Sequence, residues 1–173
     1  MSNYKALLTK VDTFIFDYDG VMTDGKLILL HDGHPLRTAN VKDGYALQLA
    51  RRLGYRVVII SGGISKSVEN RFDALRIEDV FLGVSNKIEV LEQYMKKNNL
   101  LPEQIVYMGD DIPDYKAMKK VGVPVCPADA TEEIKNISVY ISDKKGGEGC
   151  VRDIIEQVLK VQGKWMSEEA FTW

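Results

Sequence analysis

Two aspartates, Asp17 and Asp19, follow an apolar and aromatic run, with one residue between them and Gly20 after them. Such a run is typical of a buried strand, so the carboxylates are expected at an edge of a sheet. On an extended backbone both side chains would point the same way. A divalent metal would hold them there, and one carboxylate can be the nucleophile of Mg²⁺-dependent phosphoryl chemistry. Because short motifs match by chance, a strand that ends in a solvated turn is the alternative.

A serine and two glycines follow a second apolar run, 56–60. Ser61, Gly62 and Gly63 are expected where this strand leads into a helix. There the Ser61 hydroxyl and the backbone N–H groups of the glycines would form a cradle for a phosphate, because the N-terminus of a helix favours anions. A plain helix cap at Ser61 is the alternative.

A lysine, Lys87, is expected in the first turn of a later helix. A cation there opposes the helix dipole and costs about a few tenths of a kcal/mol. Its placement beside the acids therefore suggests that it is retained for a reason. An exposed, solvated lysine is the alternative.

Three aspartates, Asp110, Asp111 and Asp114, follow a third apolar run, 105–108, at a strand-to-helix turn. Carboxylates in this position suit a Mg²⁺ site that the first two aspartates begin. Helix capping would explain one of the three acids, but not all of them.

Short β-prone runs alternate with amphipathic segments along the chain. The expected strands are 13–16, 56–60, 80–82, 105–108, 121–125 and 139–141. Helices are expected between them, one capped by Asp43 and ended by Gly54, one capped by Ser85, one over 115–120, and a last one from about Cys150 to Gln162. This alternation predicts an α/β fold, a doubly wound (Rossmann-like), mostly parallel sheet with helices on both faces.

One short insertion, at about 26–41, interrupts the alternation. It indicates a β-hairpin whose turn, His31-Asp32-Gly33-His34, contains an Asp-Gly pair. The hairpin is too short to be a cap domain, so one domain is expected over 1–163, followed by a tail over 164–173. Doubly wound sheets bind ligands at the carboxyl ends of their strands, where all the polar groups described above are expected.

Composition narrows the class of protein. A chain of 173 residues with 45% apolar and 28% charged residues fits one soluble globular domain. The net charge of −2, without a long basic block, argues against nucleic-acid and membrane partners and for a small-molecule substrate. Two distant cysteines, and an N-terminus without a long apolar stretch, favour a reducing cytoplasm.

The ordered set of polar motifs resembles that of the haloacid dehalogenase-like phosphatases over residues 10–160. The motifs that carry the resemblance are Asp17-Tyr18-Asp19-Gly20-Val21, Ser61, Lys87 and Gly109-Asp110-Asp111-x-x-Asp114. The resemblance implies that Asp17 is a nucleophile that forms an aspartyl-phosphate. Asp19 would be the general acid and then the general base, and its backbone carbonyl would bind Mg²⁺.

The same resemblance gives roles to the remaining motif residues. Ser61 and Lys87 would hold the transferring phosphoryl group. Asp110 would bind Mg²⁺, with Asp111 and Asp114 in direct or indirect support. Positioning and charge neutralisation are what phosphoryl transfer requires.

A narrower resemblance is to the 3-deoxy-D-manno-octulosonate 8-phosphate phosphatases, which act in lipopolysaccharide sugar synthesis. It rests on the missing cap domain, the short hairpin, the segment Val41-Lys42-Asp43-Gly44-Tyr45 and the loop 145–152. It implies a capless homotetramer in which the hairpins form a shared barrel and neighbouring subunits close the active sites. Candidates for binding the sugar acid are then Ser61, Gly62, Arg71, Lys42, Lys145, Gly146 and Gly147. For the charged ones, ordinary surface charge is the alternative.

Gly63 departs from the pattern, because many relatives carry a charged residue after the Ser/Thr-Gly pair. It leaves open a phosphatase of a nine-carbon keto-deoxy sugar acid. A catalytically silent oligomerisation module of a sugar-activating enzyme is another alternative. A signalling receiver domain is less compatible, because its phosphorylated aspartate would follow the third strand, where this chain has Gly83-Val84-Ser85.

The tail is rich in aromatic residues, among them Trp165, Phe171 and Trp173. Because these would expose much apolar surface, the tail is expected to pack on a neighbouring subunit near the active site. Disorder is the alternative.

Overall fold

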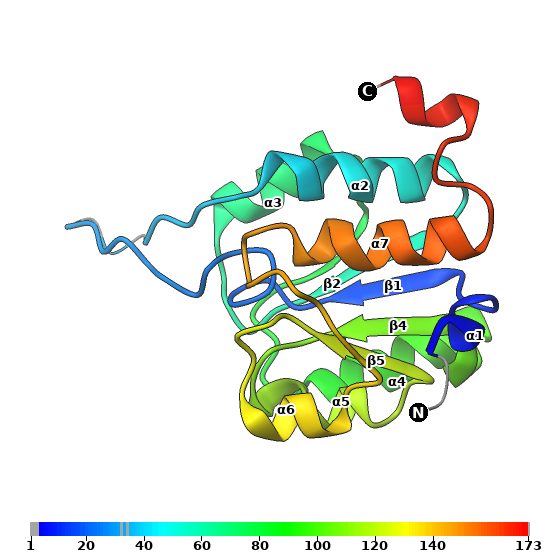
Figure 1. Cartoon of the computed structure of the whole chain (residues 1–173). Helices are drawn as coiled ribbons and strands as arrows, with labels where there is room; N and C mark the ends of the chain where they lie inside the picture. The colour runs from blue at the N-terminus through cyan, green and yellow to red at the C-terminus, as the bar shows by residue number, and fades with distance from the viewer. Residues whose placement is uncertain (1–3, 32, 34, 173) are drawn as a thin grey trace.

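A central parallel sheet organises the chain, whose computed structural model describes residues 4–31, 33 and 35–172 (Figure 1). The six strands lie in the order β3-β2-β1-β4-β5-β6, and every neighbouring pair is parallel. Their bounds are β1 (Thr13–Phe16), β2 (Arg56–Ile60), β3 (Asp79–Phe81), β4 (Ile105–Met108), β5 (Val123–Cys126) and β6 (Tyr140–Ile141). The chain builds outward from β1 to β3 and then returns through β4 to the other side, so the predicted doubly wound fold is confirmed.

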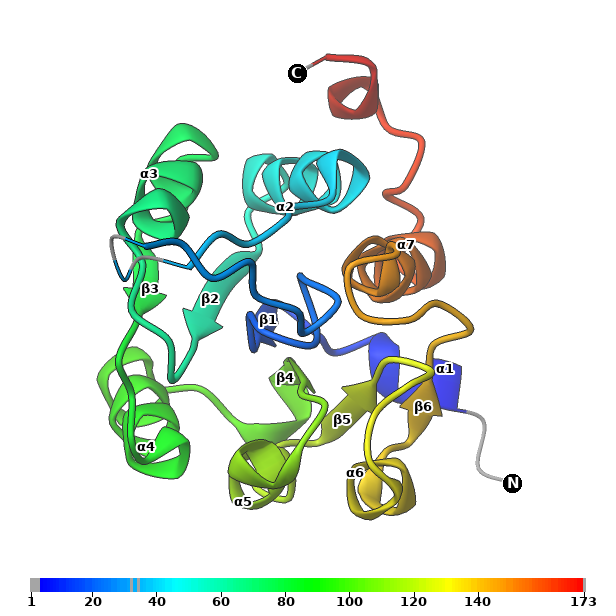
Figure 2. The same ribbon diagram turned by 90° about the vertical axis from the view of Figure 1, so that its left-hand side faces the viewer.

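Helices cover both faces of the sheet. The α-helices are α1 (Tyr4–Leu8), α2 (Val41–Arg52), α3 (Lys66–Ala74), α4 (Lys87–Asn98), α5 (Tyr115–Met118), α6 (Glu132–Ile137) and α7 (Cys150–Val161), and the 3-10 turns are η1 (Pro102–Gln104), η2 (Ile112–Asp114) and η3 (Glu168–Phe171). Figure 2 shows α2, α3 and α7 on one face and α4, α5 and α6 on the other. Within the described part of the chain, no helix combines the length and apolar character needed to cross a membrane.

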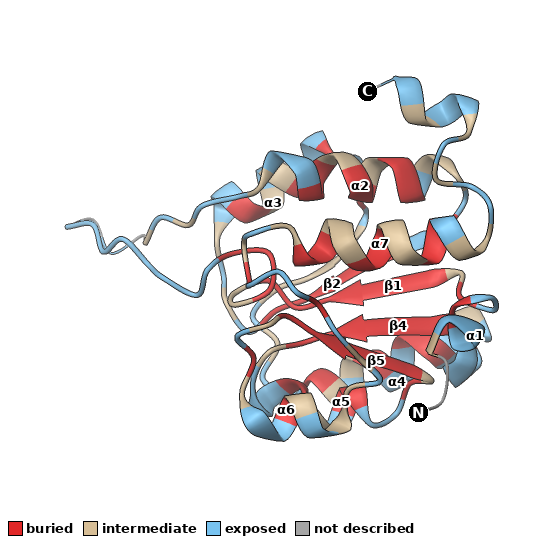
Figure 3. Ribbon diagram, viewed as in Figure 1, coloured by how far each residue is buried: buried red, intermediate tan, exposed pale blue. Residues whose placement is uncertain are grey.

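Strand β1 connects the two hydrophobic cores. Phe14 and Phe16 face the α2–α3–α7 layer, whereas Ile15 between them packs in the cluster beneath α4, α5 and α6. All three side chains are fully buried, and the neighbouring strands are buried along β4 and along β2 from Val57 to Ile60 (Figure 3). Burial of each such side chain is worth roughly 1.5–3 kcal/mol, so β1 is firmly held just before its two aspartates.

Several helix boundaries differ from those expected. Asn40 caps α2, because its side chain accepts hydrogen bonds from the backbone N–H groups of Lys42 and Asp43. The prediction that Asp43 caps this helix is therefore wrong. At α4 the N-cap position is occupied by Asn86 and not by Ser85. The short helices α1 and α6, five and six residues long, were not predicted, because segments of this length show too few periodic apolar positions.

Residues 24–39 form an arm that leaves the body of the protein (Figure 1). The expected antiparallel direction is right, because Ile28 and Leu36 make one antiparallel bridge. The described residues of the arm contain no strand, however, and two residues of the expected turn, Asp32 and His34, lie outside the described part. A two-stranded hairpin with no sheet to pack on is marginal in water, which accounts for the single bridge.

The described part of the tail packs on its own chain. Trp165 and Ala170 are partly buried against the core, and Tyr45 Oη donates a hydrogen bond to the Ala170 carbonyl. Arg52 donates to the carbonyl of Thr172 at 2.8 Å. Phe171 is 67% exposed, and Trp173 lies outside the described residues. Contact of the tail with a neighbouring subunit stays a prediction.

Asp43 links helix α2 to helix α7. Its Oδ1 accepts a hydrogen bond of 2.7 Å from the backbone N–H of Arg152, in the first turn of α7. Its Oδ2 is buried and has no hydrogen-bond partner within residues 4–31, 33 and 35–172. Burial raises the pKa of Asp43 to about 6, against the smaller opposing effects of the Arg152 N–H and charge.

Because the Asp43 pKa is higher in the folded chain than its ordinary value of 3.8, the folded state binds this proton more tightly than the unfolded state. The contribution of Asp43 to the free energy of unfolding is therefore largest below about pH 4 and is lost as the pH rises to about 6. Relative to Asp43→Asn, we expect the free energy of unfolding of the wild type to drop by up to about 3 kcal/mol over this window. Urea unfolding at a series of pH values measures the difference. Asp73→Asn, on the exposed face of α3, is the control, and a constant difference would contradict the expectation.

Candidate active site

The predicted site residues come from the carboxyl ends of three neighbouring strands. Asp17 follows β1, Ser61 follows β2 and Asp110 follows β4, and β1 pairs directly with both other strands. Parallel pairing places these ends along one edge, where the loops of a doubly wound sheet form its binding sites. Lys87 is the first residue of α4, the helix that follows β3 and its loop in the chain.

Lys87 lies between two carboxylates. Its Nζ is 2.8 Å from Asp17 Oδ1 and 2.8 Å from Asp114 Oδ1, and the Lys87 side chain is 6% exposed. Burial alone would lower the pKa of Lys87, but the charges of Asp114 and Asp17 outweigh it and raise the pKa. Lys87 is therefore a fixed cation that connects α4 to the acids at the ends of β1 and β4.

Tyr107 is a member of the cluster that sequence reasoning missed. Its hydroxyl donates a hydrogen bond of 2.9 Å to Asp114 Oδ1, the same oxygen that Lys87 contacts. Both side chains are almost fully buried. The available signal was a tyrosine inside the apolar strand β4, since a buried hydroxyl needs a partner.

Asp17, Asp110 and Asp114 form a group that could hold a metal ion. Each offers a carboxylate oxygen, and these oxygens all lie within 4.8 Å of one another. Burial, followed by the charge of Asp114, raises the pKa of Asp17 to about 6, although Lys87 opposes the rise. Burial, Asp17 and Asp114 raise the pKa of Asp110 to about 8. One lysine thus leaves the three acids short of positive charge, and an oxygen-only donor set fits Mg²⁺.

Gly20 allows the loop after β1 to approach Asp110. Its φ is +89°, and a Cβ at this position would lie only 2.1 Å from Asp110 Oδ2. Any larger residue would push the loop away from the acids. The glycine after the Asp-x-Asp pair is therefore needed for the closeness of the two loops.

Asp19 faces a different partner from the other acids. Its carboxylate, which is 33% exposed, accepts hydrogen bonds from Arg37 of the arm, Nε to Oδ1 at 2.8 Å and Nη2 to Oδ2 at 3.0 Å. Sequence reasoning did not include Arg37. It lies 18 residues from Asp19 in the arm, and one arginine in an exposed segment gives no signal.

The expected phosphate cradle is arranged differently from the prediction. Helix α3 begins at Lys66, so Gly62 and Gly63 lie on a loop ahead of the helix and not at its N-terminus. Ser61 is buried, its backbone is held by β3 and the following loop, and its Oγ accepts a hydrogen bond of 3.3 Å from the Gly63 N–H. Ser61 still lies at the carboxyl edge, beside the strand that carries Asp17.

Asp111 stands apart from the acid cluster. It is exposed, and its side chain accepts a hydrogen bond from the backbone N–H of Ile112, so it caps η2. Of the expected metal residues, the structure brings Asp17, Asp110 and Asp114 together and leaves the side chains of Asp19 and Asp111 outside the group.

The candidates for sugar binding are spread around the edge. Arg71 is half-buried, and its guanidinium lies over Gly44, where it lines a small cavity with Tyr18 and Asp43. Lys42 and Lys145 are exposed. Gly146 and Gly147 pack behind the loop after β1: the N–H of Gly147 donates to the Val21 carbonyl, and Asn40 donates to the carbonyl of Gly147. Among the described residues, Arg71 thus lines a cavity beside Tyr18, and the two glycines contact the loop that carries Asp19 and Gly20.

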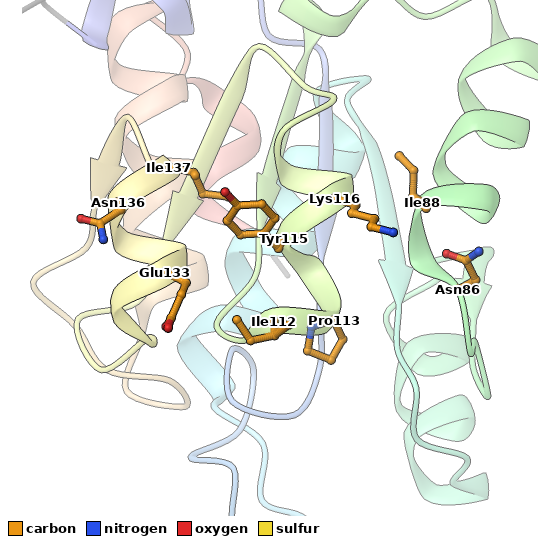
Figure 4. A pocket seen from close by; sticks show the side chains of 9 residues that line it. All are labelled: Asn86, Ile88, Ile112, Pro113, Tyr115, Lys116, Glu133, Asn136 and Ile137. Atoms are coloured by element: carbon orange, nitrogen blue, oxygen red, sulfur yellow. The ribbon is translucent and has the colours of Figure 1, made fainter.

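A larger cavity, of about 550 Å³, is lined by Ile112 and Pro113 of the loop that also carries Asp110 and Asp114 (Figure 4). It opens between α4, α5 and α6, and its lining includes Ile88, Ile112, Tyr115 and Ile137. None of the clustered acids lines it. Its lining is mostly apolar, so it does not suit a phosphate group, and the acid cluster is the candidate active site.

Because the pKa of Asp110 is about 8, Mg²⁺ has to displace a proton at neutral pH. We expect its affinity to rise with pH, by up to about tenfold per pH unit below pH 8, and to level off above it. Titration calorimetry with Mg²⁺ at several pH values measures this. Asp110→Asn should weaken binding and flatten the dependence near pH 8, whereas Asp143→Asn, an exposed control, should do neither. An affinity that stays constant from pH 6 to pH 9 would contradict the assignment.

Comparison with known proteins agrees with this geometry. Residues 77–154 match the sequence profile of the haloacid dehalogenase-like hydrolases. The 3-deoxy-D-manno-octulosonate 8-phosphate phosphatase KdsC of Salmonella typhi is 35% identical over 161 residues, which are 91% of this chain and 86% of the relative. KdsC of Escherichia coli is 37% identical over 150 residues, 87% of this chain and 80% of the relative.

Solved structures of such phosphatases superpose closely. The enzyme from Yersinia pestis has a TM-score of 0.93 and 31% identity, and the match covers 96% of this chain and 90% of that one. The enzyme from Moraxella catarrhalis, solved with a magnesium ion, a phosphate ion and a KDO molecule, has a TM-score of 0.90 and 31% identity over 94% of both chains. The chain therefore belongs to the haloacid dehalogenase-like hydrolases, in the family of the 3-deoxy-D-manno-octulosonate 8-phosphate phosphatases.

Proposed function

We propose that this chain is a Mg²⁺-dependent phosphatase that hydrolyses 3-deoxy-D-manno-octulosonate 8-phosphate to the free sugar acid and phosphate, in lipopolysaccharide sugar synthesis. The observation that carries the proposal is the buried Lys87, which contacts Asp17 and Asp114 beside Asp110. The relatives that this chain matches over most of their length are named for this activity. One lysine among three acids suits the binding of a metal ion and a phosphoryl group. A loop that only capped a helix would not need this buried lysine.

In the first step, Asp17 attacks the phosphorus atom. A bond forms between its carboxylate oxygen and phosphorus, and the bond from phosphorus to the terminal oxygen of the sugar breaks. Asp19 donates a proton to this oxygen, so the sugar leaves as an alcohol. Lys87 and Ser61 hold the phosphoryl oxygens, and Lys87 also keeps Asp17 in the direction of attack.

In the second step, a water molecule attacks the phosphorus atom of the aspartyl-phosphate. Asp19, now a carboxylate, takes a proton from this water, and the bond between phosphorus and the Asp17 oxygen breaks. Phosphate leaves, and both aspartates return to their starting forms. Asp19 thus serves as acid and then as base, for which its partial exposure at the edge of the cluster is suitable.

Asp17, Asp110 and Asp114 would hold Mg²⁺ with the backbone carbonyl of Asp19, and Asp111 would support them from outside the group. Bound Mg²⁺ supplies charge neutralisation for the phosphoryl oxygens. The Tyr107 hydroxyl and Lys87 keep the Asp114 carboxylate in place.

Arg71 would bind the carboxylate of the sugar acid, because it is half-buried and lines a small cavity with Tyr18, which lies between Asp17 and Asp19 in the chain. Ser61 and Gly62 would contact the phosphate. Lys42, Lys145, Gly146 and Gly147 are candidates for the sugar hydroxyls. Gly63 offers no side chain to the substrate.

The assembly that we propose is a cytoplasmic homotetramer, with residues 1–163 as the phosphatase domain and 164–173 as its tail. Its support is the arm, on which the apolar side chains of Leu27, Ile28 and Leu29 are 44%, 59% and 81% exposed. A row of exposed apolar side chains on a projecting segment is typical of a protein interface. Arms that pair with one another would cover this surface and close the active sites.

Phosphate release from a panel of sugar phosphates tests the function. With Mg²⁺, we expect clear preference for the eight-carbon acid over the nine-carbon keto-deoxy acid, and a loss of at least about a thousandfold in Asp17→Asn, which lacks the nucleophile. Preference for another phosphate would leave Asp17 as nucleophile and overturn the substrate. A well-folded protein that releases phosphate from none of them would be the silent module.

The size of the assembly tests the proposed role of the arm. A charge at Leu29 would lie in the apolar contact between arms, so we expect Leu29→Asp to dissociate the tetramer at micromolar concentration. Light scattering after gel filtration measures the mass. Leu101→Asp places the same charge on an exposed leucine outside the arm and should leave the tetramer intact. A wild type that is monomeric, or a Leu29→Asp variant of unchanged mass, would contradict the assignment.

A further inference from the structure

One residue of the arm is turned toward the active site. Leu36 and Thr38 are exposed, whereas the side chain of Arg37 between them is 7% exposed. Side chains alternate on extended backbone, so the arm presents Arg37 to the body of the protein while its neighbours face solvent. Another ion pair of the arm, Lys26 with Asp24, has side chains 85% and 43% exposed and is an ordinary surface pair.

Arg37 holds both carboxylate oxygens of Asp19. Its Nε lies 2.8 Å from Oδ1 and 3.1 Å from Oδ2, and its Nη2 lies 3.0 Å from Oδ2. A guanidinium that grips a carboxylate with two nitrogens fixes the plane and the direction of the carboxylate, which a single ammonium cannot do.

The loop after β2 closes over this pair. A Cβ at Gly63 would lie 2.9 Å from Arg37 Nη2 and 3.1 Å from Asp19 Oδ2. A side chain at this position would therefore meet both partners. The absence of a side chain at Gly63 gives Arg37 its place against Asp19, so three segments meet there: the arm, the loop after β1 and the loop after β2.

We propose that Arg37 is the positioning residue for proton transfer by Asp19, so that the arm is part of the catalytic apparatus within its own chain. The inference rests on the proposed function, in which Asp19 gives a proton to the leaving oxygen. A carboxyl group that is misdirected by a fraction of an ångström transfers protons poorly. The need for this transfer is greatest when the leaving oxygen is a strong base, and it is small when the leaving group is 4-nitrophenolate.

Substituted phenyl phosphates test this, because they lack the sugar and differ mainly in the basicity of the leaving oxygen. Phenyl phosphate and 4-nitrophenyl phosphate are the end members. In Arg37→Ala we expect kcat/KM to fall at least about tenfold for phenyl phosphate and less than about threefold for 4-nitrophenyl phosphate. Arg37→Lys should recover part of the loss, since it restores the charge and one donor. Lys26→Ala, at the exposed ion pair of the arm, should match the wild type on both.

Three results would overturn the inference. An equal loss of kcat/KM on all phenyl phosphates would mean that Arg37 only supports the fold. Thermal unfolding of Arg37→Ala and Arg37→Lys would then show a matching loss of stability. A loss confined to the sugar-acid phosphate would make Arg37 a substrate contact. No loss at all would make the pair a surface contact.

Failure of the inference is distinguishable from failure of the proposed function. A wild type that hydrolyses the phenyl phosphates but not the eight-carbon sugar acid phosphate would overturn only the proposed substrate, and the comparison of variants would still decide the role of Arg37. A wild type that hydrolyses none of these phosphates would overturn both.

Discussion

A buried lysine between two buried carboxylates is the interaction on which the rest of the structure depends. Lys87 contacts Asp17 and Asp114 at 2.8 Å, with Asp110 nearby. Transferring these charges from water costs several kcal/mol per ion by rough expectation, and only close pairing offsets it. The carboxyl ends of strands β1 and β4 and the first residue of helix α4 therefore have to lie close to one another. The two hydrophobic cores on either side of β1 supply the stability that allows this concentration of charge.

The loops around the acids are held by each other as much as by the strands. Asn40 caps α2 and also donates to the carbonyl of Gly147, whose N–H donates to Val21. Asp43, in the first turn of α2, accepts a hydrogen bond from the backbone of Arg152 and so links this group to the first turn of α7. Segments that are more than a hundred residues apart in the chain thus form one rigid frame behind the loop after β1. A rigid frame of this kind keeps catalytic groups in place before the substrate arrives.

Much of this could be predicted from the sequence, because its main signals are local. Apolar runs placed β1, β2 and β4 within their observed bounds, and parallel topology then brought the acids and Ser61 to one edge. The features that were missed depend on partners distant in the chain. Asp43 was expected to cap its own helix, but its side chain serves α7, 109 residues away. The tyrosine inside the apolar run of β4 indicates that the Tyr107 hydroxyl needs a partner, but it does not say which one. Arg37 carries no local signal, because an arginine of the arm becomes informative only once its carboxylate partner is located.

The alternation of the arm has a consequence for how its length can vary among relatives. Leu36 faces out and Arg37 faces in because successive side chains of an extended segment point to opposite sides. The bridge at Leu36 and the helix cap at Asn40 hold the two ends of this short segment. Adding or removing one residue between Leu36 and Asn40 would therefore turn a neighbour of the arginine toward Asp19 and send the arginine into solvent. Residues added on the far side of the bridge, between Ile28 and Leu36, would leave the direction of Arg37 unchanged, because the bridge keeps its register.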